Sequence, residues 1–113
     1  MLALSLWLVL GAAAIGGVIT ARWHATLGIV HALLGACSLF VLLLALRGPP
    51  RGVAMGVASF GRIAAGLLAF ALLMGIFFAA LRLRAKPVPG LIIGVHVTIA
   101  ISGIVMLAAY ALV

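Results

Sequence analysis

Four long apolar stretches, separated by short polar or basic segments, make up almost the whole chain. They cover about residues 2–20, 25–46, 57–81 and 90–113. A helix needs roughly 20 apolar residues to cross the hydrocarbon core of a bilayer, and each stretch is about that long. The pattern predicts a single transmembrane domain over residues 1–113, built from four membrane-spanning helices.

The segments between the stretches predict short turns at the membrane surface. A basic and aromatic segment, 22–24, follows the first stretch, and the segments 47–51 and 82–89 each contain two prolines. Proline lacks the backbone N–H that an inner helix position needs, so the helices end there. Short connections place consecutive helices antiparallel. We therefore expect an all-α, up-down-up-down bundle in which the second and fourth spans are diagonal.

The first stretch also has features of a signal peptide. An apolar run, Leu2–Leu10, is followed by the small residues Ala12–Ala14, which have the character of a cleavage site. No basic residue precedes the run, although a signal peptide normally begins with one. We expect the segment to be retained as the first membrane span.

The composition supports a membrane protein and excludes several functions. Of the 113 residues, 69% are hydrophobic and 6% are charged, whereas soluble domains are about half apolar and about a quarter charged. The chain has no Asp or Glu, so it lacks the carboxylates that acid–base catalysis, Ca²⁺ or Mg²⁺ binding and proton relays usually require. No Walker loop, HExxH or CxxC pattern occurs. We expect no catalytic activity of the chain on its own.

Seven basic residues and no acidic ones give a net charge of +7. They lie near the ends of the apolar stretches: Arg22, Arg47, Arg51, Arg62, Arg82, Arg84 and Lys86. Lipid headgroups attract charges at such positions, so we expect contact with the membrane surface and not with nucleic acid. The larger share of these basic residues lies in segments 22–24 and 82–89. The positive-inside rule then places these loops in the cytoplasm and both termini outside, and we expect a bacterial inner membrane.

Two histidines lie at equivalent positions of the second and fourth spans. At an offset of 65 residues, segment 30–38 aligns with segment 95–103, and His31 aligns with His96. Each is the seventh residue of its span, so both are expected at the same depth, roughly 10 Å from the start of the helix. Small residues follow on the same helix face at i+4 and i+7: Gly35 and Ser38 after His31, and Ala100 and Gly103 after His96. The first and third stretches share only Gly and Ala richness, so the two-helix repeat is partial.

Two interpretations of this pair remain open. Imidazoles from facing helices are a common way to hold the iron of haem b in a bundle, and small residues leave room for the macrocycle. Arg82 and Arg84, on the same side, would then meet the propionates. Alternatively, each histidine hydrogen-bonds to a neighbouring helix and the small residues only permit close packing. Such spacings are common in membrane helices and occur here at Gly52–Gly56 and Gly90–Gly94, with Ala12–Gly16 and Ala13–Gly17 as relaxed versions. The layout resembles membrane b-type cytochromes in general, but those with two haems need four intramembrane histidines.

Three other polar residues are expected to serve the bundle. His24 lies about two helical turns from His31, roughly 10 Å, so one zinc ion with ligands at about 2 Å is excluded for His24, His31 and His96. We expect His24 to pair with Trp23 at the interface. Arg62 is expected to extend to the headgroups, and the single cysteine, Cys37, to be a small buried residue.

Two functional classes follow. The first is a small non-enzymatic subunit of a larger electron-transfer or respiratory membrane complex, with haem b between the second and fourth spans. The second is a stand-alone bis-histidine haem b electron carrier that interacts with quinone. A small four-helix transporter acting as a homo-oligomer comes third, because most such transporters keep a buried carboxylate. The expected partners are the bilayer, other membrane subunits or further copies of the chain, and quinone.

Overall fold

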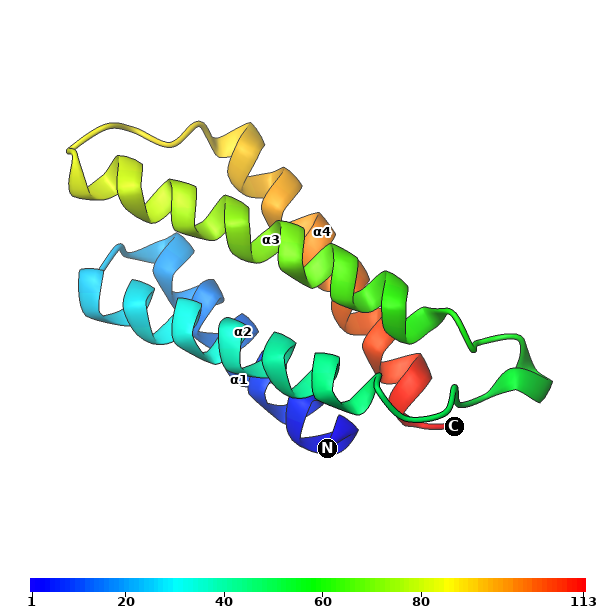
Figure 1. Cartoon of the computed structure of the whole chain (residues 1–113). Helices are drawn as coiled ribbons and strands as arrows, with labels where there is room; N and C mark the ends of the chain where they lie inside the picture. The colour runs from blue at the N-terminus through cyan, green and yellow to red at the C-terminus, as the bar shows by residue number, and fades with distance from the viewer.

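Four long helices joined by short connections form the computed structural model, which describes all 113 residues (Figure 1). The helices are α1 (Leu2–Ala21), α2 (Ala25–Ala45), α3 (Phe60–Leu83) and α4 (Gly90–Ala111), with a single 3₁₀ turn, Val53–Met55, between α2 and α3. Each long helix has the length and apolar composition to cross a membrane, and the chain contains no strand. The protein is therefore a multi-pass integral membrane bundle of four helices, as the sequence predicts.

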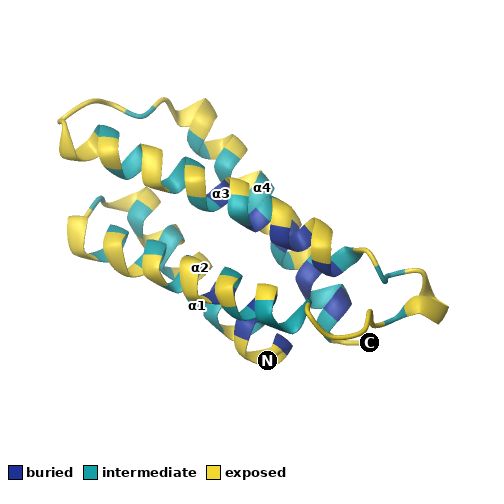
Figure 2. Cartoon of the chain, in the orientation of Figure 1, coloured by how far each residue is buried: buried dark blue, intermediate teal, exposed yellow.

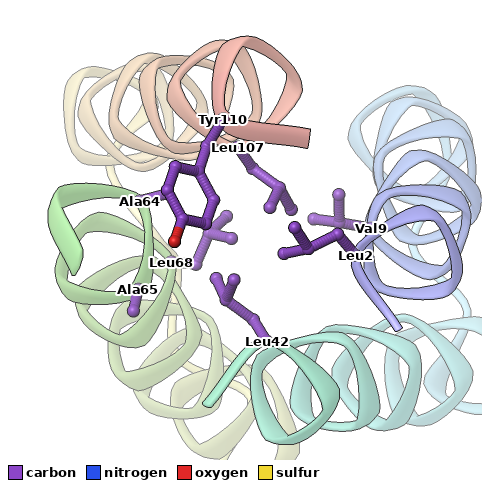
Figure 3. Close-up of a cluster of buried hydrophobic side chains, with 8 residues drawn as sticks. All are labelled: Leu2, Val9, Leu42, Ala64, Ala65, Leu68, Leu107 and Tyr110. Atoms are coloured by element: carbon purple, nitrogen blue, oxygen red, sulfur yellow. The ribbon is translucent and has the colours of Figure 1, made fainter. Parts of the chain in front are cut away.

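The helices stand at the corners of a square, which Figure 3 shows in a view along the bundle. The backbones of α1 and α2, α2 and α3, α3 and α4, and α4 and α1 lie side by side, whereas α1–α3 and α2–α4 have no Cα atoms within 8 Å of each other. The up-down-up-down order is thus confirmed, and α2 and α4 are diagonal. Both termini and the α2–α3 connection lie at one end of the bundle, and the other two connections lie at the opposite end (Figure 1).

The α2–α3 connection is longer than the sequence indicated, and α3 begins at Phe60 instead of residue 57. Gly52 and Gly56 have φ values of 64° and 73°, in the left-handed region that favours glycine. The backbone N–H of Val57 donates to the carbonyl of Gly52, which closes this turn. The helix cannot start before the left-handed Gly56, and this accounts for its later start.

All 14 buried residues lie in the half of the bundle that carries the termini. Figure 2 shows them gathered towards that end, whereas the half that contains the 22–24 and 84–89 connections has intermediate and exposed positions only. The central cluster in Figure 3 consists of Leu2, Val9, Leu42, Ala64, Ala65, Leu68, Leu107 and Tyr110. The bundle is thus tightly packed in one half and loosely packed in the other.

Two buried serines join α1 and α2 inside the packed half. Ser5 Oγ donates to the Ser38 carbonyl at 2.9 Å, and Ser38 Oγ donates to the Ser5 carbonyl at 2.8 Å. Both side chains are fully buried. Each hydroxyl therefore satisfies a backbone carbonyl of the other helix, which lets two polar side chains lie in the core without an unpaired group.

Two expectations for single residues have different outcomes. Cys37 is exposed, so the expected burial is wrong. It directly precedes the buried Ser38, and neighbouring residues on a helix point about 100° apart, so Cys37 faces away from the core. Arg62 is exposed in the first turn of α3, near the end of the bundle, where its side chain can extend towards the headgroups.

Candidate functional site

The two helical hairpins, α1–α2 and α3–α4, are equivalent in their packing. Residues of α1 correspond to residues of α3 at an offset of 59, and residues of α2 to those of α4 at an offset of 65. Twelve of the 14 buried residues form six such pairs: Leu2 with Gly61, Ser5 with Ala64, Val9 with Leu68, Ala12 with Ala71, Ser38 with Gly103, and Leu42 with Leu107. The bundle therefore has an approximate twofold axis along its length, which is the direction of the membrane normal, and the repeat includes both halves of each hairpin.

His31, from the second turn of α2, packs against a small-residue surface on α1. Its Nδ1 lies 2.7 Å from the carbonyl oxygen of Ala12, so in the tautomer protonated at Nδ1 it donates a hydrogen bond to that oxygen. A Cβ on Gly16 would lie only 2.9 Å from the ring. Glycine is thus required at position 16 for the ring to lie this close to α1. The Ala12 bond occupies Nδ1, which leaves Nε2 as the nitrogen free to bind another group.

His96, from the equivalent turn of α4, packs against the corresponding surface of α3. A Cβ on Gly75 would lie 3.5 Å from its ring. Its Nδ1 is buried and makes no hydrogen bond, although the backbone of Ala71, the counterpart of Ala12, lies near the ring. The ring of Phe78 meets His96 edge-on, with centres 5.4 Å apart. His96 therefore has the same surroundings as His31, except that its Nδ1 lacks a completed hydrogen bond.

The two imidazoles face each other across the middle of the loosely packed half. Their ring centres are 6.3 Å apart, and the ring planes are inclined by 65°. Both line a cavity of about 170 Å³ between the hairpins. Its wall near the rings consists mainly of small residues: Ala12, Ala13, Gly16, Ala32, Gly35, Ala71, Gly75 and Ala100. No other His, Cys, Asp or Glu joins the pair to make a group of three. The arrangement offers two nitrogen ligands from opposite sides of a space with flat, small-residue walls.

The end of the cavity towards the membrane surface contains its only charged residue. Arg82, at the end of α3, lines the cavity, and its Cζ lies 5.8 Å from the centre of the Trp23 ring. This distance is typical of a cation–π contact, and it connects the two hairpins across the cavity entrance. Because the chain has no carboxylate side chain, Arg82 has no Asp or Glu partner within the protein.

The predicted site residues divide into three groups. His31, His96, Gly35, Ala100 and Arg82 all line the cavity. Ser38 and Gly103 lie deeper and serve helix packing: Ser38 bonds to Ser5, and a Cβ on Gly103 would lie 2.9 Å from Leu68. Arg84 lies outside the cavity lining and is exposed at the end of α3.

The residues of α1 and α3 that receive the two rings were not predicted from the sequence. They follow one pattern, Ala-x₃-Gly, which occurs at Ala12–Gly16 and again at Ala71–Gly75. A single offset of 65 for the whole chain hides this match. The offset between α1 and α3 is 59, because α3 continues past the counterpart of Ala21 and the connection that follows it is also longer. Phe78 also contacts His96, and its counterpart in the first hairpin is Ile19, which lines the cavity as well.

Comparison with known proteins gives no family for the chain: no family model, curated protein or solved structure shows a significant match.

Proposed function

We propose that this protein holds one haem b between His31 and His96 and works as an electron-transfer unit in the membrane, as a small subunit of a larger complex. The observation that carries the proposal is the pair of imidazoles, from diagonal and equivalent helices, that face one cavity at a ring-centre distance of 6.3 Å. Two metal–imidazole bonds of about 2 Å, with the depth of both rings added, give a separation of about 6 Å.

The surroundings of the histidines favour ligation over simple helix contact. Metal-binding histidines usually donate their second ring N–H to a carbonyl or carboxylate, which fixes the tautomer and the ring orientation. The bond from His31 Nδ1 to Ala12 has this form and leaves Nε2 for the iron. A histidine that served only to join two helices would not need a matching partner across a cavity. In addition, the rings lie where the packed core ends, since Ala12 and Ala71 are the last buried residues of α1 and α3 before the cavity entrance.

The charge around the cavity suits an anionic cofactor. Haem b carries two propionates, and Arg82 lies at the cavity entrance with no Asp or Glu to pair with. Guanidinium groups bind carboxylates through paired, charge-assisted hydrogen bonds. Arg84 and Lys86 are exposed just beyond it and add positive charge on the same side. When bound, the haem would supply reversible one-electron transfer. The chain's own residues would hold the iron, orient the ring and neutralise the propionates.

The role as a subunit rests on how little of the chain lies outside the bundle. Segments 22–24 and 84–89 are the only connections at the cavity end. They are too short to form a separate binding domain, so a protein partner at this end would contact the helix faces in the membrane. Many large apolar side chains do point outward, among them Trp7, Phe40 and Leu73. These faces are available to lipid and to neighbouring subunits.

The test is a visible spectrum of the purified protein, oxidised and reduced, from haem-replete cells. We expect a sharp α-band in the reduced protein that is lost in both His31→Ala and His96→Ala. His24→Ala is the matched control, because His24 does not line the cavity, and it should keep the band. Added imidazole should partly restore the band in the His31→Gly variant, which separates a lost ligand from a lost fold. A colourless wild-type protein that also fails to bind added haemin would overturn the proposal.

A further inference from the structure

We propose that a groove between α2 and α3, on the lipid-facing side of the bundle, binds the isoprenoid tail of a membrane quinone and guides the quinone ring to the entrance of the histidine cavity. The use of a bound quinone as redox partner rests on the proposed haem, whereas the binding itself needs only the groove. The groove lies along a stripe of α2 whose side chains are smaller than those at the corresponding positions of α4.

Along one face of α2, small residues stand where α4 has bulky ones. At the offset of 65, the pairs are Gly28 with Ile93, Ala32 with Val97, and Ala36 with Ile101. The other two helices differ in the opposite sense, because Leu72 and Ile76 of α3 stand at the positions of Ala13 and Gly17 of α1. The buried pair Leu42 and Leu107 is identical. The stripe on α4 fills the space next to α1, because Ile93 and Val97 themselves line the cavity wall there. The stripe on α2 faces Leu72 and Ile76 of α3 instead, and the space that remains between the small residues and these two side chains is a groove.

A groove of about 310 Å³ occupies this space between α2 and α3. It runs from Trp23 and Ala25 to Ala36, a distance of roughly 17 Å along α2 at 1.5 Å per residue. Five residues line both the groove and the histidine cavity: Trp23, Gly28, Ala32, Leu72 and Ala79. The two spaces are therefore separated only by these side chains, and a molecule in the groove lies against the edge of the cavity.

The lining determines the chemical class of the occupant. Every residue of the groove is apolar or glycine, apart from the indole N–H of Trp23, so the occupant must enter from the bilayer. At the entrance, the polar groups are the N–H donors of Trp23 and Arg82, with no acceptor side chain from Asp or Glu. A quinone presents two carbonyl acceptors on a flat ring and carries a long apolar tail. It thus matches the donors, the aromatic face and the length of the groove together.

Photolabelling in lipid nanodiscs tests this assignment. The full chain, in phosphatidylcholine and phosphatidylglycerol, is irradiated with an azido-benzoquinone that carries an isoprenoid tail, and the labelled peptides are identified by mass spectrometry. We expect label in segments 23–36 and 72–83, and its loss when unlabelled ubiquinone-2 is added. The double variant Ala32→Val/Ala36→Ile gives α2 the residues of its α4 counterpart and should lose the label. Ala36→Ile alone, at an exposed position, should weaken it.

The controls separate this proposal from the haem proposal. Ala14→Val adds a branched side chain on the exposed face of α1 and should label as the wild type does. Even labelling of all lipid-facing segments, or full labelling of the double variant, would overturn the quinone site. So would displacement of the label by additional phosphatidylglycerol, which would identify a phospholipid site. The label is read from the peptide whether or not haem is bound. A labelled but colourless protein therefore contradicts only the haem, and a coloured but unlabelled protein contradicts only the quinone site.

Discussion

Replacing Gly16 with alanine tests whether His31 packs closely against α1. A Cβ at position 16 would lie 2.9 Å from Cε1 and 3.3 Å from Nδ1 of His31. The neighbouring residue supplies a matched control, because a Cβ on Gly17 would have no atom within 4 Å. Gly75, the counterpart of Gly16 on α3, is a second control, with 3.5 Å to His96, an ordinary contact distance.

The expected size of the effect follows from these distances. Gly→Ala inside a helix gains up to about 1 kcal/mol in helix propensity, and this gain is shared by Gly16→Ala and Gly17→Ala, so it cancels between them. At position 16 the ring can move into the cavity and give up its bond to Ala12, which costs about 1 kcal/mol. If the ring stays, the overpacking costs up to about 3 kcal/mol. Gly16→Ala should thus be about 1–3 kcal/mol less stable than Gly17→Ala, and Gly75→Ala should match Gly17→Ala.

The free energy of unfolding of the three variants can be compared by SDS titration in mixed micelles, with helicity followed by circular dichroism. Equal stability of Gly16→Ala and Gly17→Ala would refute the close packing of the His31 ring against Gly16. A selective loss in Gly75→Ala would contradict the looser contact at His96. The measurement does not depend on any cofactor, provided that the protein is prepared without haem.

Two further predictions concern the packed half of the bundle. Leu42→Ala and Leu107→Ala remove equivalent, fully buried side chains, so each should lower the free energy of unfolding by about 2–5 kcal/mol. Leu43→Ala, at an exposed position, is the control and should lower it far less in the same titration. If Leu42→Ala is tolerated while Leu107→Ala is not, the hairpins are not equivalent in their packing. Ser5→Ala and Ser38→Ala should each cost about 1 kcal/mol, because each removes a bond to a carbonyl of the other helix. The double variant should cost less than the sum, because the two Oγ atoms also lie 3.1 Å apart and each single variant removes this shared contact. Strict additivity in the double-mutant cycle would contradict the contact between the hydroxyls.

The number, order and approximate limits of the spans are predictable from the sequence because hydrophobic length and proline positions determine them locally. The matching depth of His31 and His96 is also predictable, since both are the seventh residue of their helix. The start of α3 at Phe60 was not, because the left-handed turn at Gly52 and Gly56 depends on the closing bond from Val57. An apolar stretch of sequence does not by itself indicate that this backbone hydrogen bond forms.

The side chains around the histidines were harder to assign, because small residues are frequent throughout the chain. Ser38 and Gly103 lie on the same helix faces as His31 and His96, yet they lie deeper, where the hairpins close on their own cores. Which small residue borders a cavity and which borders a neighbouring helix depends on where the hairpins separate. That separation is a property of all four helices together, and the fourteen glycines in the sequence do not distinguish these positions.

The twofold relation between the hairpins bears on why one half of the bundle is loosely packed. In a membrane, helices associate mainly through close packing and interhelical hydrogen bonds, because lipid is as apolar as the side chains. In the packed half, Leu42 and Leu107 supply the close packing, and Ser5 and Ser38 supply the interhelical hydrogen bonds between α1 and α2. In the other half, the contacts that cross between the hairpins are those of His31 with His96 and of Arg82 with Trp23. The hairpins would gain by closing there unless something occupies the space, and Ala12 and Gly16 of α1 recur as Ala71 and Gly75 of α3. Their repetition on both sides therefore favours a ligand that needs two equivalent walls.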